Sequence, residues 1–312
     1  MSELPGAVRI REVGPRDGFQ NEPEVIPTER KVELIDALAR TGLARLEVTS
    51  FVRADVIPQL ADATEVLAQI DVPAEVSVSV LIPNERGLDN ALALRDAHRG
   101  SRPAFDEVNV FLSASETHNE KNVNSSIADS LAGLEVVLER ARGAGLRCEG
   151  VISTSFGCPY EGRVPPERVL EIAARLRDAG AQEIGFGDTT GMANPRQVGE
   201  FFAAARASLG GEVELTAHFH NTRGQGLANV LAALGAGVES FESSFGELGG
   251  CPVPAGATGN IATEDLVSML HEMGISTGIE LAALIATAER AQAILGRPLG
   301  SHTLLAGPVD WR

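Results

Sequence analysis

The sequence predicts a (β/α)8 barrel, the TIM-barrel form of the α/β class, with an additional helical segment at its C-terminal end. Short β-branched runs alternate with segments of helical periodicity along the whole chain, without a low-complexity linker. A chain of 312 residues is also a common length for one such barrel. We therefore expect a single catalytic domain over residues 1–312, with the barrel at about 7–275 and the helical extension at about 276–312.

Eight short segments are predicted to be strands, because most of them contain β-branched residues and they are bounded by turn residues. In chain order these segments are Ala7–Val13, Arg45–Thr49, Glu75–Leu81, Glu107–Phe111, Arg147–Ser153, Glu183–Gly187, Glu214–His218 and Ser240–Ser243.

The clearest helical segments lie between these strands. They are Thr28–Arg40, Ser126–Gly143, Pro166–Gly180, Pro195–Ala207 and Leu227–Leu234. Thr28 is expected to cap the first helix, with Glu29 in its first turn, and glycine follows most of the segments. A further helix, Leu281–Leu295, lies beyond the barrel in the sequence, and we expect it to cover the rim or the base.

The main alternative is an open, doubly wound sheet that binds a dinucleotide. Such a sheet would carry a GxGxxG turn after its first strand. The turn found there is Gly14-Pro15-Arg16-Asp17-Gly18, which has a rigid proline and charged side chains instead. This difference favours the barrel.

The charge of the chain excludes one class of partner. A formal net charge of −17 argues against nucleic acid, because binding phosphate groups requires a basic field. An anionic small molecule would have to be met by clustered cations. The candidates near the strand ends are Arg16, Arg53, Lys121 and Arg223.

The cysteines and the N-terminus indicate a cytoplasmic protein. Cys148, Cys158 and Cys251 are odd in number and show no CxxC spacing, which favours a reducing compartment over a disulfide framework. The N-terminus has no apolar signal core, and no run is long enough to span a membrane. We expect no membrane partner.

Two histidines at the end of the seventh strand could bind a metal. His218 and His220 are spaced i, i+2, which on a strand places both rings on one face, roughly 6.5–7 Å apart along the chain. Two neutral ring nitrogens and a carboxylate from elsewhere could hold a divalent cation and leave positions open for a substrate. The alternative is a pair of surface histidines.

Further polar residues fall where barrel strands end, which is where such barrels place their active sites. The first strand ends in Arg16 and Asp17. Glu47 lies inside a β-branched run, and since helices cover the outside of a barrel we expect it to point inward and pair with Arg16. Asp188 ends the sixth strand and could either serve the site or cap the following helix.

The loop after the eighth strand holds a cysteine among many glycines. Cys251 is therefore expected to lie on a mobile loop rather than in the core. Cys148 lies in an apolar strand and is expected to be inert packing, while both interpretations stay open for Cys158. His118 follows the fourth strand and faces the same rim, where it could contact a ligand.

Five segments in the right order resemble the 3-hydroxy-3-methylglutaryl-CoA lyase family, within the wider metal-dependent lyase and aldolase barrels. The likeness runs from about Val8 to Gly274. Its segments are Glu12–Glu22 (EVGPRDGFQNE), Glu47–Val52 (EVTSFV), Gly157–Gly162 (GCPYEG), the histidine pair, and Gly249–Pro252 (GGCP) through Gly259 and Asn260.

The resemblance implies a set of site residues. A Mg²⁺ or Mn²⁺ ion would be held by four of them, namely Asp17, His218, His220 and Asn260. Arg16 would polarise the thioester carbonyl, with Glu47 and Asp188 in supporting or proton-transfer roles, and Cys251 would supply a proton. Gln20 and Arg223 would contact the substrate, although Arg223 could equally pair with a surface acid.

The implied reaction is the cleavage of a 3-hydroxy-3-methylglutaryl-CoA-like thioester to acetyl-CoA and acetoacetate. Asn221 and Arg223 stand where the family usually has an aspartate and an aromatic residue, and Val253 also replaces an aromatic residue. A related substrate such as citramalyl-CoA or a longer 3-hydroxyglutaryl-CoA therefore stays open. The family also implies a homo-oligomer, a dimer or larger.

Four other functions compete with this one. A condensing synthase usually carries a Thr-Leu-Arg-Asp-Gly turn and additional C-terminal sequence, and a hydroxy-oxo-acid aldolase does not account for the cysteine loop. Two histidines and a carboxylate could also bind ferrous iron for oxygenase chemistry. A binding protein without catalysis is disfavoured because all the reactive residue types are present.

Overall fold

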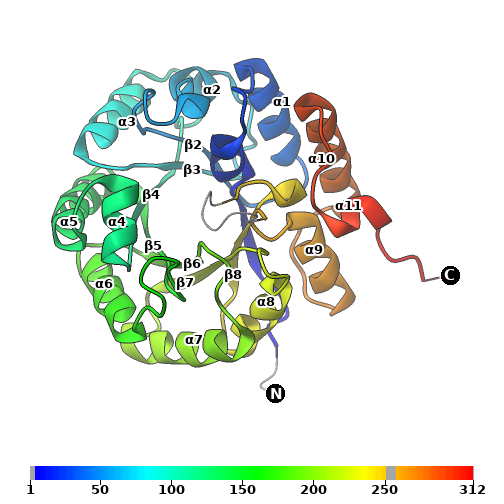
Figure 1. Ribbon diagram of the computed structural model, residues 1–312. Helices are drawn as coiled ribbons and strands as arrows, with labels where there is room; N and C mark the ends of the chain where they lie inside the picture. Colours follow the sequence, from blue (N-terminus) through cyan, green and yellow to red (C-terminus); the bar gives the residue numbers. More distant parts are fainter. Residues whose placement is uncertain (1–3, 251–257, 312) are drawn as a thin grey trace.

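The computed structural model describes residues 4–250 and 258–311. Eight parallel strands close into a barrel in sequence order, and helices surround it (Figure 1). The strands are β1 (Arg9–Glu12), β2 (Arg45–Ser50), β3 (Ser77–Leu81), β4 (Glu107–Ser113), β5 (Arg147–Ser153), β6 (Glu183–Asp188), β7 (Glu214–Phe219) and β8 (Ser240–Ser243). Each predicted strand is confirmed, with ends that differ by two residues at most.

Helices form the outer layer. They are α1 (Thr28–Leu38), α2 (Ala63–Gln69), α3 (Glu85–Ala97), α4 (Glu116–Val123), α5 (Ile127–Gly143), α6 (Pro166–Asp178), α7 (Pro195–Leu209), α8 (Gly226–Gly235), α9 (Thr263–Glu272), α10 (Leu281–Leu295) and α11 (His302–Ala306). The predicted cap at Thr28 is wrong, because Pro27 precedes the helix and the Thr28 hydroxyl donates to Asp62 Oδ2 at 2.7 Å.

Two kinds of interior follow from the alternation of side chains along each strand. On β2 to β6 the even-numbered residues, such as Val78, Val108 and Ile184, are buried in the hydrophobic core between the strands and the helices. The odd-numbered residues of β1 to β6 point into the barrel, whereas on β7 and β8 the even-numbered ones do so, and many of these inward residues are polar or charged. The buried charged side chains in the barrel are Arg11, Arg45, Glu47, Glu107, Glu149 and Glu183 at odd positions, and Glu242 on β8.

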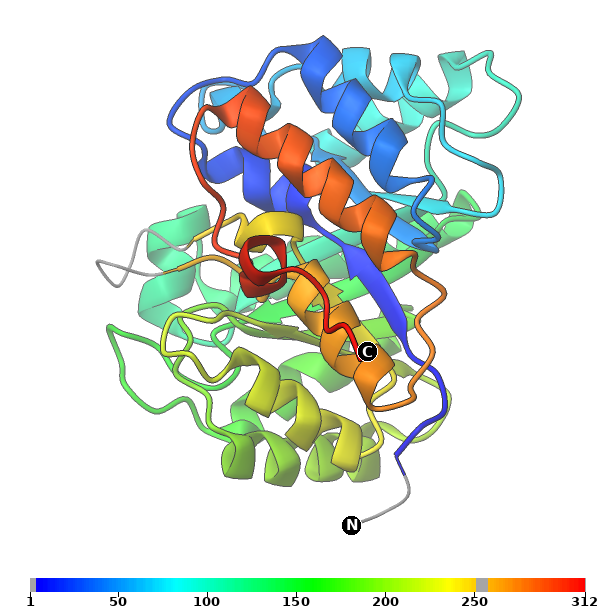
Figure 2. The same ribbon diagram turned by 90° about the vertical axis from the view of Figure 1, so that its right-hand side faces the viewer.

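The C-terminal helices lie against the side of the barrel. Figure 2 shows α10 crossing this side, where it packs on α1 and α9. The expectation that Leu281–Leu295 covers the rim or the base is therefore wrong, although its bounds are confirmed. Leu284, Ala288 and Ala291 form the buried face that makes this lateral packing stable. Among the described residues, the structure contains no helix with the length and apolar character needed to cross a membrane.

Candidate active site

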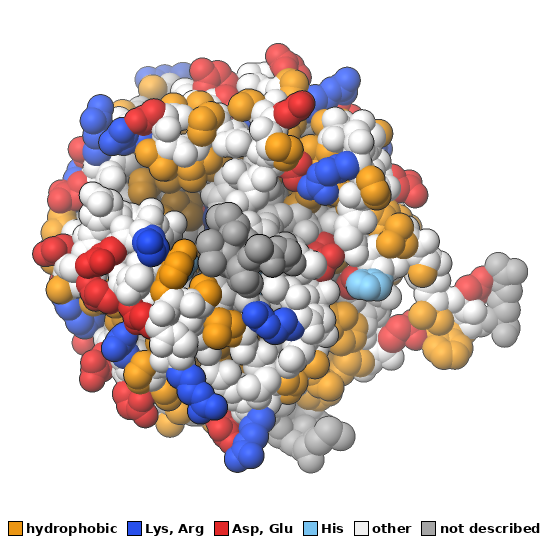
Figure 3. Space-filling view, viewed as in Figure 1, with side chains coloured by type: hydrophobic (Ala, Val, Ile, Leu, Met, Phe, Trp, Pro, Cys, Tyr) orange, Lys and Arg blue, Asp and Glu red, His pale blue; other side chains and the backbone are white. Residues whose placement is uncertain are grey.

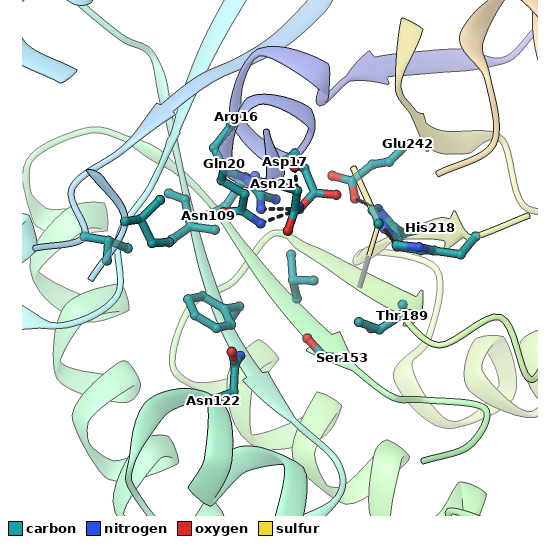
Figure 4. A pocket seen from close by; sticks show the side chains of 18 of the residues that line it. Arg16, Asp17, Gln20, Asn21, Asn109, Asn122, Ser153, Thr189, His218 and Glu242 are labelled. Carbon is teal, nitrogen blue, oxygen red and sulfur yellow. Dashed lines mark hydrogen bonds and ion pairs between the residues drawn. The ribbon is translucent and has the colours of Figure 1, made fainter. Parts of the chain in front are cut away.

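Three predicted metal ligands gather at the carboxyl ends of the strands. Asp17, His218 and His220 each offer a ligand atom, and these atoms lie within 4.8 Å of one another. The two histidine Nε2 atoms are 3.1 Å apart, and His220 stands just beyond the end of β7. Figure 4 shows Asp17 pointing from the β1 side toward His218. The alternative of a surface pair is excluded, because His218 and His220 are 9% and 5% exposed.

Asn260 completes the group. Residues 259–261 run beside the end of β7, and a bridge between His220 and Asn260 fixes the position of the amide. Asn260 Nδ2 donates to Asp17 Oδ2 at 2.7 Å and to the Leu248 carbonyl at 3.1 Å. Its Oδ1 is buried and has no hydrogen-bond partner among the described residues. An orphaned amide oxygen beside a carboxylate and two imidazoles fits a divalent cation as its fourth protein ligand.

The loop after β1, which carries Asp17, packs closely against the loop after β8, which carries Gly249. Residues Gly14–Gly18 form one π-helical turn, in which the Val13 carbonyl accepts from the amides of Arg16 and Asp17. Gly249 has a φ of +86°, and a Cβ placed there would lie 2.9 Å from Asn260 Nδ2. Only glycine combines this conformation with so close an approach. The predicted Gly-rich loop is thus required for the geometry of Asp17 and Asn260.

The electrostatics of the group suit cation binding. Burial would raise the pKa of Asp17, but Arg16 and the two histidines outweigh it and lower the pKa to about 2. Burial, together with the charge of His218, lowers the pKa of His220 to about 3. Burial alone would also lower the pKa of His218, yet its hydrogen bond to Glu242 raises it. Asp17 is thus anionic at neutral pH and His220 is neutral, which are the forms that bind metals.

Arg16 lies next to this group and is held in place by carboxylates. Its Nε donates to Glu47 Oε1 at 2.5 Å, and its Nη1 donates to Asp17 Oδ1 at 2.7 Å. Asn109 Nδ2 donates to the other oxygen of Glu47 at 3.1 Å. The predicted inward placement of Glu47 and its pairing with Arg16 are confirmed. Arg16 is therefore a fixed positive charge at the edge of the metal group.

A cavity of about 340 Å³ opens beside these residues. Gln20 lines it and donates to Asp17 Oδ1 at 2.9 Å. His118 also lines it, in a position where the predicted ligand contact could form. Across from the metal group the wall is apolar, formed by Val52, Ile57, Leu81, Phe111 and Val151. Figure 3 shows this end of the barrel with a hollow in which apolar side chains are visible.

Asp188 lies apart from the pocket. As an even-numbered residue of β6 it points toward the helix layer, and its Oδ1 accepts from the amides of Met192 and Ala193 at 2.8 and 3.0 Å. Its Oδ2 has no hydrogen-bond partner among the described residues, and burial raises its pKa to about 7. This position favours the supporting alternative, in which Asp188 holds the loop that carries Thr189. A role in proton transfer stays a prediction.

Arg223 binds the backbone of the loop after β6. Its Nη1 donates to the carbonyls of Thr190 and Gly191 at 3.0 and 2.7 Å, and it is absent from the pocket lining that the described residues form. Asn221 similarly donates to Glu247 Oε1 at 2.9 Å. Asn221 and Arg223, the two residues here that differ from the family pattern, therefore each connect neighbouring loops. The substrate contact of Arg223 stays a prediction that this geometry does not favour.

The three cysteines of the chain have different outcomes. Cys251, the predicted proton donor, and Val253 lie outside the described residues. Cys148 is buried in the hydrophobic core, and burial raises the pKa of its thiol to about 11. Both observations agree with the prediction that this cysteine is an unreactive core residue. Cys158 is also buried, and its Sγ accepts from the Ser115 hydroxyl at 3.0 Å. This contact assigns Cys158 to loop structure.

Sequence reasoning missed several residues of the site. Glu242 accepts a hydrogen bond from His218 Nδ1 at 2.8 Å, and Figure 4 shows its carboxylate beside that ring. Asn109, Asn122, Ser153 and Thr189 also line the pocket. The signal that could have found Asn109 and Ser153 is the alternation of polar and apolar residues along the strands.

Several known proteins are similar to this chain in fold and in sequence. The HMGL-like family matches residues 7–290. Hydroxymethylglutaryl-CoA lyase YngG of Bacillus subtilis is 45% identical over 96% of this chain and 97% of that protein. Mitochondrial hydroxymethylglutaryl-CoA lyase of Rattus norvegicus is 42% identical over 98% of this chain and 91% of that protein. The structure of an HMG-CoA lyase from Acinetobacter baumannii, in complex with coenzyme A and 3-methylmalate, has a TM-score of 0.91 at 39% identity and covers 100% of this chain and 99% of that chain. This chain therefore belongs to the HMGL-like family, as its sequence motifs indicated.

Proposed function

We propose that this protein is a divalent-metal-dependent carbon–carbon lyase that cleaves 3-hydroxy-3-methylglutaryl-CoA, or a close analogue, to acetyl-CoA and acetoacetate. The observation that carries the proposal is the convergence of Asp17, His218, His220 and Asn260 beside the partly buried Arg16 and an open cavity. The hydroxymethylglutaryl-CoA lyases among its relatives support the substrate class.

The residues present suit a retro-Claisen cleavage. The C2–C3 bond of the substrate breaks as the C3 hydroxyl loses its proton and becomes the ketone of acetoacetate. The bond's electron pair passes into the thioester, and the resulting enolate takes a proton at C2 to give acetyl-CoA. A bound Mg²⁺ or Mn²⁺ would supply Lewis-acid activation of the hydroxyl. Arg16 supplies a permanent positive charge for the enolate oxygen.

Proton transfer to C2 needs a mobile acid. In our proposal this acid is the thiol of Cys251, since a thiol with a pKa of ~8.5 can deliver a proton at neutral pH. Glu47 positions Arg16 through its short bond to Nε, and Gln20 orients Asp17 and meets the substrate in the cavity. Asp188 supports the loop beside them.

A longer acyl group is the second candidate substrate. The apolar wall that includes Leu81, Phe111 and Val151 is more extensive than a single methyl substituent needs. Such a wall favours apolar atoms on the acyl part of the substrate or along the pantetheine arm. A 3-hydroxyglutaryl-CoA with a longer alkyl branch would fill it, whereas citramalyl-CoA would fill it less.

The test is a panel of 3-hydroxyacyl-CoA thioesters, incubated with the enzyme and Mg²⁺ or Mn²⁺ and followed by acetyl-CoA release. We expect the fastest release from 3-hydroxy-3-methylglutaryl-CoA or its longer-branched homologue, and none after exhaustive chelation. Condensation of acetyl-CoA with a 2-oxo acid in the absence of cleavage would assign a synthase instead. Full activity after chelation would refute the metal-dependent mechanism.

Our proposal also includes a cytoplasmic location and a homo-oligomer, a dimer or larger, with the whole chain acting as one catalytic domain. Gel filtration with light scattering tests the oligomeric state directly.

A further inference from the structure

The barrel axis beneath the histidines is occupied by charged side chains from several strands. Arg11 on β1 lies at the centre, and its side chain is 0% exposed. Its Nη1 donates to Glu242 Oε1 at 2.8 Å and also to Glu149 Oε2. Its Nη2 donates to Glu107 and Glu183 at 3.3 Å each. One guanidinium is thus shared by four carboxylates.

Glu242 connects this cluster to the proposed metal site. While its Oε1 accepts from Arg11, its Oε2 accepts from His218 Nδ1 at 2.8 Å. Strand register places the three residues in one row, because Arg11 is paired with Glu242 between β1 and β8, and His218 with Glu242 between β7 and β8. The backbone hydrogen bonds of three neighbouring strands therefore fix these contacts.

This row determines which nitrogen of His218 faces the site. A carboxylate that accepts from Nδ1 keeps the proton on that nitrogen, so that the lone pair of Nε2 is directed at the neighbouring ligands. His218 Nε2 lies 3.1 Å from His220 Nε2 and on the side of Asp17. Without Glu242 the ring could rotate or carry its proton on Nε2, and either change would remove a ligand.

We propose that Glu242 is a positioning residue for His218, and that Arg11 holds Glu242 in the orientation that presents His218 Nε2 to a divalent cation. The proposal rests on the part of the proposed function that places a cation at Asp17, His218 and His220. It does not depend on the identity of the thioester. Arg11 and Glu242 act through His218 and touch no reacting atom.

The chain offers a matched control for this proposal. Glu149 and Glu242 both accept from Arg11 Nη1, and both are almost fully buried, at 1% and 2% exposed. Only Glu242 also contacts His218. The variants Glu149→Gln and Glu242→Gln therefore remove comparable buried charges, while only the second one alters the ligand.

The first test measures binding of Mn²⁺ alone, by electron paramagnetic resonance, to wild type and to both folded variants. We expect E242Q to weaken binding by about 10- to 100-fold, and E149Q to weaken it by less than about threefold. Equal losses in the two variants would overturn the proposal, because the effect would then follow from buried charge in general. Asp17→Asn checks that the Mn²⁺ signal reports this site.

A second measurement needs no variant and covers the case in which E242Q does not fold. Long-range ¹H–¹⁵N spectra of the histidine-labelled wild type, saturated with Mg²⁺, assign the tautomer of His218. We expect a protonated, hydrogen-bonded Nδ1 and an unprotonated Nε2, and the opposite tautomer would overturn the proposal. Tight Mn²⁺ binding without cleavage of any thioester would refute the proposed function and leave this inference intact.

Discussion

The sharpest prediction concerns Glu264, a fully buried carboxyl on α9 that joins the loops of the site. Both of its oxygens accept from the Gly246 amide, at 3.1 and 2.9 Å. Burial raises its pKa to about 8, with a smaller contribution from the nearby carboxyl of Glu12. Glu264 is therefore largely protonated in the folded protein at neutral pH, whereas it ionises at its ordinary pKa in the unfolded chain.

The sign and size of the effect follow from this difference. A carboxyl whose pKa is raised by folding contributes stability at low pH, and this stability is lost as the pH rises from 4.5 through about 8. Each pH unit in this window costs about 1.4 kcal/mol. Between about pH 5.5 and about pH 8.5 the loss attributable to Glu264 is therefore about 3 kcal/mol.

The variant Glu264→Gln removes this titration while preserving the shape of the side chain. Its free energy of unfolding should approach or exceed that of wild type at the higher pH and gain nothing at the lower pH. The assay is equilibrium unfolding in guanidinium chloride at both pH values, supported by melting temperatures. With an unfolding entropy of ~2.1 cal/mol/K per residue, the relative shift is about 5 °C.

Glu289 provides the control, because it is exposed on α10. The variant Glu289→Gln should follow the wild-type pH profile within experimental error. If E264Q and wild type show parallel profiles, then Glu264 is ionised in the folded protein, and the reasoning from burial is wrong.

Three further predictions concern activity. The variant Arg16→Lys should lower kcat by about 10²-fold or more in steady-state kinetics, because lysine cannot reproduce the planar guanidinium that Glu47 orients. A normal kcat would show that Arg16 does not stabilise the enolate. Cys251→Ala should lower turnover by about 10²–10⁴-fold while Mn²⁺ affinity is unchanged, and near-wild-type turnover would exclude the thiol as the proton donor. Phe111→Ala removes part of the apolar wall and enlarges the cavity, so kcat/KM for a longer-branched thioester should rise by about tenfold relative to that for the methyl compound. An unchanged ratio would show that the acyl branch binds elsewhere.

The fold and the metal group could be predicted because each depends on a local pattern. Strands such as Ser77–Leu81 can be recognised by their β-branched residues, and the ends of parallel strands meet at one edge of a barrel. Asp17 and His218 could therefore be placed together despite their separation in the chain. The position of Asn260 depended on family resemblance, because its bridge to His220 has no signature in the sequence.

What could not be predicted depends on contacts between distant residues. Arg223 was a candidate for substrate binding, but whether a guanidinium meets a ligand or the carbonyls of Thr190 and Gly191 is decided by loop conformation. Thr28 has the residue type of a helix cap, yet its hydroxyl donates a hydrogen bond to Asp62, which is remote in sequence. The lateral packing of α10 was likewise invisible, since an amphipathic helix does not specify its partner.

The guanidinium of Arg11, shared among four strands, limits how this chain can evolve. Loss of the arginine leaves the buried carboxylates of Glu149 and Glu242 without a guanidinium partner, and it leaves Arg45 as the buried guanidinium that pairs with Glu107 and Glu183. Substitutions at these positions should therefore be inherited together. Among descendants of this gene, positions 11, 107, 149, 183 and 242 would covary as a set, while the apolar residues on the opposite faces of the same strands drift one at a time.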